Sequence, residues 1–151
     1  MKCNICAIAL IGILGITPLC YAQKSSDETS IEEVKQETQE LLQTLGAYTV
    51  DQRDEAIRKS KKALDAIDKR LDRLEARVDK GWDKMDKTAR KKARDSLKAL
   101  RKQRNKVAEW YGSLKNSTGN AWGHMKKGFL DAYETLNSAW EKSENEFTSR
   151  K

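Results

Sequence analysis

The chain has 151 residues and a formal net charge of +7, and 35% of its residues are charged. Such a high charged fraction is typical of long solvated helices and argues against a dense globule with many layers. With one proline and eight glycines, little interrupts a helix, so the composition favours an all-α fold.

The first 22 residues have the pattern of a secretory signal peptide. A short charged end, Met1-Lys2, precedes an apolar run over residues 5–16, which is too short to span a bilayer comfortably. Cys20 and Ala22 place small residues at the third and first positions before a cut. We expect cleavage after Ala22 and an exported protein, either periplasmic or secreted. All three cysteines lie in this segment, so the mature chain must be held together by packing alone.

The mature chain is predicted to be one domain. Residues 23–29 are polar and expected to be flexible, and residues 30–151 are expected to form a single helical domain. Ser30 and Glu33 match a capping box, which predicts a first helix over residues 31–45 that stops at Gly46. Thr49 to Gln52 is a second match, so the next helix should begin there.

The segment that follows carries one apolar stripe. At 100° per residue its apolar side chains fall in a single sector and keep phase across Gly81. The members are Ile57, Leu64, Ile67, Leu71, Val78, Trp82, Met85, Ala89, Ala93, Leu100, Val107, Tyr111 and Leu114. This continuity predicts one long central helix over residues 52–114, roughly 90 Å long at 1.5 Å per residue. The expected fold is therefore an elongated, antiparallel, coiled-coil-like helical hairpin, with the central helix flanked by two others.

Gly81 offers an alternative for the same segment. A glycine can end one helix, and Asp83 can cap the next, which would fold the chain into a compact four-helix bundle. Phase continuity favours the continuous helix, because a turn has no evident reason to preserve the stripe.

The C-terminal part predicts a last helix over residues 119–147. Lys115 to Asn120 is rich in turn and capping residues, and we interpret it as the loop before this helix. An aromatic and apolar stripe follows, which we interpret as interhelical core: Trp122, Phe129, Tyr133, Leu136, Trp140 and Phe147.

The run from Ala121 to Gly128, followed by Ala132, Leu136, Ala139-Trp140 and Phe147, resembles a known family. It is similar to the small exported coiled-coil stress-response proteins first annotated in cyanobacteria, over roughly residues 54–147. The resemblance implies a helical protein linked to stress and implies no defined activity. Gly123 departs from the family pattern, and no catalytic residue carries over.

Catalytic chemistry is not indicated by the residues. His124 is the single histidine, and the mature chain has no cysteine beside it, so a zinc site is not expected. Phosphate-binding glycine loops and nucleophile elbows are missing from the sequence, and the carboxylates alternate with lysine and arginine as on solvated helix faces. We therefore expect no enzymatic activity, no cofactor and no small-molecule substrate.

The charge is concentrated between Lys87 and Lys106, which hold ten bases and one acid, Asp95. These bases can form a solvated helix face without a binding role. Alternatively, they can form a contact surface for anionic lipid or envelope polyanions. The candidate contacts are Arg90, Lys91, Arg94, Lys98 and Arg101. Nucleic acid would suit the same charge, but export and the shortage of interleaved aromatic residues disfavour it.

The predicted helix lengths also leave one part of the stripe uncovered. The flanking helices of an elongated hairpin would not reach Leu71, Leu74, Val78 and Trp82, and these four residues form the predicted association stripe. Two functions follow from these patterns. The first is an exported, non-enzymatic interaction or structural protein of the cell envelope that acts by helix–helix association, as a homodimer or with an envelope protein. The second is a reversible amphipathic-helix binder of anionic membrane surfaces.

Overall fold

The structure is a computed structural model in which residues 31–148 are described, with side chains described from residue 32 to residue 145. It contains four α-helices: α1 (Ile31–Ala47), α2 (Arg53–Gly81), α3 (Lys87–Lys115) and α4 (Gly119–Thr148). No strand occurs within these residues, so the predicted all-α class is confirmed. The predicted signal peptide and the segment 23–29 lie outside the described residues.

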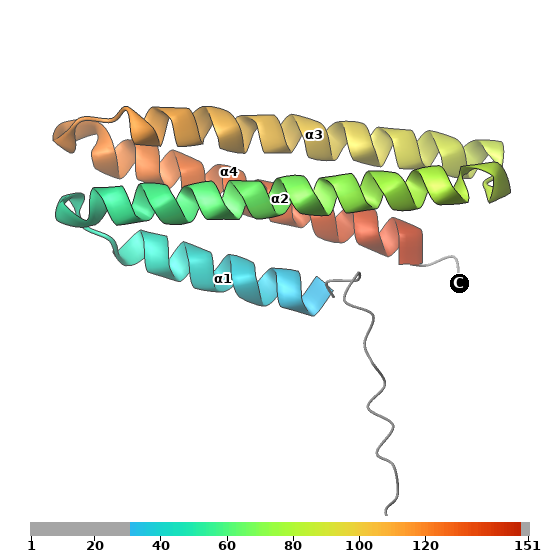
Figure 1. Ribbon diagram of the computed structural model, residues 1–151, viewed down its shortest axis with the longest axis horizontal. Coiled ribbons are helices and arrows are strands. Elements are labelled where there is room, and N and C mark those ends of the chain that lie inside the picture. Colours follow the sequence, from blue (N-terminus) through green and yellow to red (C-terminus); the bar gives the residue numbers. More distant parts are fainter. Residues whose placement is uncertain (1–30, 149–151) are drawn as a thin grey trace, which may run out of the picture.

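The four helices form an up-down-up-down bundle (Figure 1). Each helix packs on the next one along the chain, and α4 closes the ring by packing on α1. Polar contacts fix this order: Arg53 Nη2 donates to Lys115 O at 2.7 Å between α2 and α3, and Lys126 Nζ donates to Gly46 O at 2.7 Å between α4 and α1. In such a ring α1 and α3 lie at diagonal corners.

The continuous central helix predicted over residues 52–114 is wrong. The helix ends at Gly81, and a 3₁₀ turn (Trp82–Lys84) follows it. Met85 and Asp86 then adopt extended backbone angles, and the Asp86 carboxylate caps α3 by accepting a hydrogen bond from Ala89 N at 2.7 Å. The chain reverses here, so the alternative four-helix bundle with a turn at Gly81 is the observed fold, although the cap is Asp86 instead of Asp83.

The apolar stripe keeps its helical phase across Gly81 even though the chain turns there, because the turn has a length that preserves the phase. Val78 on α2 and Ala89 on α3 both face the core and are 3% and 5% exposed. They are eleven residues apart, which is close to three helical turns of 3.6 residues whether or not those residues are helical. Each helix must present its own apolar face to the same core, so an ideal projection cannot distinguish a rod from a hairpin.

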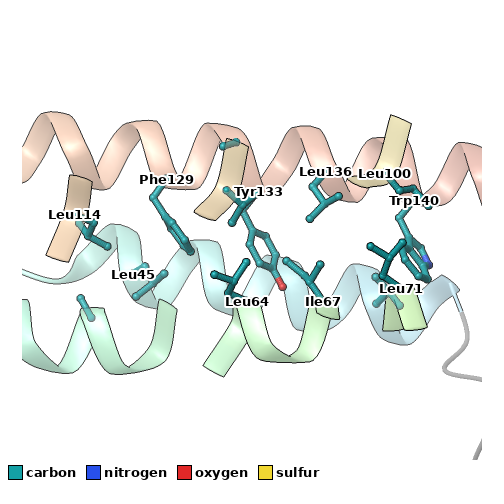
Figure 2. Packing of buried hydrophobic residues seen from close by; sticks show 14 of the residues in the cluster. Leu45, Leu64, Ile67, Leu71, Leu100, Leu114, Phe129, Tyr133, Leu136 and Trp140 are labelled. Atoms are coloured by element: carbon teal, nitrogen blue, oxygen red, sulfur yellow. The ribbon is translucent and has the colours of Figure 1, made fainter. Parts of the chain in front are cut away.

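The core is shared by all four helices. Figure 2 shows Phe129, Tyr133, Leu136 and Trp140 of α4 directed toward the apolar side chains of α2. Trp122 is buried with them, so five of the six predicted core residues are confirmed. The sixth, Phe147, has a side chain outside the described residues. The outer helices also match prediction closely, because the observed α1 and α4 extend the predicted 31–45 and 119–147 by only one or two residues.

The premise of the predicted association stripe is also wrong. Leu71, Leu74 and Val78 are 8%, 1% and 3% exposed within a single chain. Trp82 is half-buried, with Arg90 and Arg94 over its ring. The hairpin folds α3 back onto this part of α2, so the stripe needs no second copy to cover it. The reason for predicting a dimer through these residues is thereby removed.

The third and fourth helices pack closely because small side chains line their interface. Ala93 on α3 is fully buried, and Ala132 on α4 is 8% exposed. Gly128 has the tightest surroundings, since a Cβ atom placed there would overlap the six-membered ring of the Trp110 indole. The indole of Trp110 therefore occupies the space that any other residue at 128 would need.

We expect the hairpin to be visible as a short distance between Arg58 and Glu109, which are both exposed. A continuous helix would separate them by about 76 Å at 1.5 Å per residue. Spin labels on Arg58→Cys and Glu109→Cys in a chain of residues 23–151 should give a distribution centred below half that value. A separation near the longer distance would contradict the chain reversal at residues 82–86.

We expect Gly128→Ala to destabilise the bundle by about 1–3 kcal/mol, because the new methyl group must displace the Trp110 ring. Gly123→Ala is the matched control in the same helix, since the methyl group that it adds would have no heavy atom within 4 Å. It should stabilise α4 by up to about 1 kcal/mol through helix propensity. Urea unfolding followed by circular dichroism measures both changes, and an equal effect of the two would contradict the Trp110 contact.

Candidate functional site

The described structure holds no metal-binding cluster around its single histidine. His124 is exposed, and its ring meets that of Trp110 edge-on at 6.0 Å between centroids. Across residues 31–148, no three His, Cys, Asp or Glu side chains come together as a metal site would require. Within the same residues, every helix is too short or too polar to cross a membrane.

Two hollows lie beside α1. A small one opens between α1, α2 and α4, and its lining includes Arg70, Tyr133 and Trp140. A shallow groove runs between α1 and α2, with Ala63, Ala66 and Leu41 among its apolar lining and charged residues of both signs around them. Between these two hollows Arg70, which is 8% exposed, forms an ion pair with Glu37.

Tyr133 is the titratable group that both hollows share. Burial raises the pKa of its phenol, Arg70 opposes that rise, and Glu37 adds to it. The phenol is therefore neutral at physiological pH and is not poised as a base. The Arg70–Glu37 pair joins α2 to α1, so this polar cluster is best explained as a structural contact.

Charge is divided unequally among the four helices. The sequence of α3 contains eleven lysines and arginines and two acids, Asp95 and Glu109. In contrast, α1 has four acids and one base, and α4 has five acids and three bases. Because α1 and α3 occupy diagonal corners, the bundle has a strongly basic edge opposite an acidic one.

The predicted anionic-surface contacts all lie on α3, but the structure places them differently. Lys98 is exposed and has no ion-pair partner among the described residues. Lys91 Nζ lies 3.0 Å from Asp95 Oδ2 on the same helix, and Arg101 Nη2 lies 2.7 Å from Glu75 Oε2 of α2.

The remaining two predicted contacts, Arg90 and Arg94, turn toward Trp82. Their guanidinium carbons lie 5.4 and 4.7 Å from the centroid of the indole ring. Arg90 Nε also donates to Trp82 O at 3.2 Å. Arg90 is half-buried, whereas Arg94 is exposed.

Acidic residues of the neighbouring helix α2 form ion pairs with the bases on one side of α3. Arg104 forms two hydrogen bonds with the Asp68 carboxylate, both at 2.6 Å. Hydrogen bonding to Asp68 raises the pKa of the Arg104 guanidinium, and hydrogen bonding to Glu75 does the same for the pKa of Arg101. These pairs join the two helices and neutralise part of the charge.

The exposed bases along the outer side of α3, which include the ion-paired Lys91 and Arg101, form a row that we name the α3 basic face. It consists of Lys87, Lys91, Arg94, Lys98, Arg101, Lys102 and Lys106. Lys87, Lys102 and Lys106 were not among the predicted contacts, and like Lys98 they have no ion-pair partner in the described part of the chain. A helical projection of α3 alone could have included Lys102, but which bases α2 neutralises depends on the hairpin.

No protein-family model, no curated protein and no solved structure matches this chain. The resemblance to coiled-coil stress-response proteins therefore stays a prediction, and function has to be argued from the surface of the bundle.

Proposed function

We propose that this protein is an exported, non-enzymatic helical bundle that binds an anionic surface of the cell envelope through the α3 basic face. The observation that supports the proposal is the concentration of unpaired lysines on one edge of a bundle whose diagonal edge is acidic. A stress-related role, as the family resemblance implies, belongs to the same proposal.

The shape of the α3 basic face suits an extended partner better than a small ligand. From Lys87 to Lys106 it covers about 28 Å of helix at 1.5 Å per residue. The lysines lie along the outside of a convex bundle and do not converge on one point. Such a row can contact several charges of a lipid surface or polymer at once, while the acidic α1 is repelled and helps to orient the bundle.

The binding free energy expected from the lysines is small, so this binding is reversible. A lysine near an anionic membrane surface contributes about 1 kcal/mol. Four unpaired lysines then supply about 4 kcal/mol, which corresponds to a dissociation constant near 1 mM. Screening at physiological salt, where the Debye length is about 8 Å, weakens the attraction further. Charge alone thus brings the protein to a surface without holding it there firmly.

Association with a protein partner is the other predicted function, and it needs a surface other than the predicted association stripe. Leu71, Leu74 and Val78 of the predicted association stripe are buried, so in the folded bundle these three residues cannot form the contact. An acidic envelope protein could meet the α3 basic face instead. The same lysines would then carry the interaction, and the choice between the two partners is decided by binding to protein-free vesicles.

We expect the mature chain to bind vesicles that contain anionic lipid, to ignore purely zwitterionic vesicles, and to dissociate as salt rises. Binding at low salt should weaken by about 100-fold when glutamine replaces Lys98, Lys102 and Lys106. The reason is that each lysine contributes about 1 kcal/mol to the binding free energy. Co-sedimentation with vesicles across a salt series measures this effect.

The matched control removes the same charge from α2 through Lys62→Gln, Lys69→Gln and Arg73→Gln. These residues are exposed and have no ion-pair partner in the described structure. The control should keep most of the affinity of the unmodified protein. Equal losses in the two variants would mean that net charge, and not the α3 basic face, drives binding.

A further inference from the structure

We propose that the anionic surface is a lipid bilayer and that Trp82, at the tip of the α2–α3 hairpin, enters its headgroup region as an apolar anchor. This inference rests on the proposed function and narrows it from anionic surfaces in general to lipid. It also supplies the apolar contribution that the lysines alone do not provide.

The first argument is the position of the tip. The linker Trp82–Asp86 lies at the end of the bundle that α1 does not reach (Figure 1). The N-terminal half of α1 sits beside the middle of α2, where Glu37 pairs with Arg70. From Arg70 to Gly81 α2 continues for about 16 Å at 1.5 Å per residue, whereas α1 continues from Glu37 to Ile31 for only about 9 Å. The tip therefore projects at one end of the molecule and is free of steric cover from α1.

The second argument is the chemistry of the tip. Trp82 and Met85 are both half-buried, so each retains accessible apolar surface on a short connection between two charged helices. Tryptophan is enriched where membranes meet water, because its apolar ring and polar N–H suit the headgroup level. An exposed linker without a binding role would more commonly contain polar turn residues alone.

The third argument is continuity with the α3 basic face. Arg94 belongs to that face, and its guanidinium lies 4.7 Å from the centre of the Trp82 ring. A lipid phosphate that binds Arg94 is consequently brought close to the indole. Arg90, on the same ring at 5.4 Å, offers a second donor for the phosphate.

Acidic residues near the tip do not cancel this attraction. Asp79, Asp83 and Asp86 lie there, but the Asp86 carboxylate is occupied by the Ala89 amide. Residues 79–94 contain seven bases against these three acids. The tip as a whole is therefore positive and complements an anionic headgroup layer.

The test uses the mature chain and vesicles of mixed phosphatidylcholine and phosphatidylserine whose acyl chains carry bromine, a short-range quencher of tryptophan. We expect the tryptophan fluorescence of the unmodified protein to fall when it binds the vesicles. The fluorescence of Trp82→Phe should be the same with and without vesicles. Trp110→Phe is the matched control, because Trp110 is also half-buried but packs against Gly128 near the opposite end of the bundle. This variant should be quenched as strongly as the unmodified protein.

A second measurement covers the case in which Trp82→Phe perturbs folding. Because residues 23–151 contain no cysteine, Met85→Cys can carry a single environment-sensitive fluorophore. Its emission should shift to shorter wavelength on anionic vesicles and stay unchanged with a soluble polyanion.

The outcomes separate the two proposals. Salt-sensitive vesicle binding with equal quenching in the unmodified protein and Trp82→Phe, together with an unshifted label at position 85, would overturn the anchor and leave the proposed function standing. Binding to a soluble polyanion or an acidic protein but not to vesicles would also overturn the anchor alone. Failure to bind any anionic partner would overturn both.

Discussion

The structure depends on one constraint, which is that the apolar stripe of residues 57–114 must be covered within a single chain. A straight helix of this length would leave its middle exposed, because neither α1 nor α4 could reach all of it. The reversal at residues 82–86 lets α2 and α3 cover each other, and α4 then packs on α3 and closes the ring on α1. Burying one leucine such as Leu74 contributes about 1.5–3 kcal/mol, so covering the whole stripe outweighs the interruption of one helix.

The same reversal determines which charges remain available. Folding α2 against α3 brings Asp68 and Glu75 to Arg104 and Arg101, so one flank of the basic helix is neutralised. The lysines on the outside of α3 have no such neighbour. The ring of four helices also places the acidic α1 at the diagonal corner, so the surface charge is polarised across the bundle although the net charge is modest. The α3 basic face is therefore a product of topology as much as of composition.

The hairpin tip combines both effects. Trp82 belongs to the apolar stripe by its position in the helical repeat, yet it lies where the helices end and the core is incomplete. Two guanidinium groups of α3 lie over its ring, which remains half-buried. A residue that would be core in a longer bundle is thus left at the boundary between the apolar interior and the basic surface.

The sequence by itself determined the all-α class, the bounds of α1 and α4, and the aromatic core of α4, because amphipathic periodicity and capping signals are local. It also located the basic segment, since charge is read directly from composition. Only the tertiary structure decided whether residues 52–114 form a rod or a hairpin. Eleven residues are nearly three helical turns, so the periodicity is the same in both cases, and the capping signal at Asp83 lay three residues from the observed cap, Asp86. The tertiary structure also decided which bases find partners, because Asp68 and Glu75 meet α3 only after the chain reverses, through contacts between residues far apart in the sequence.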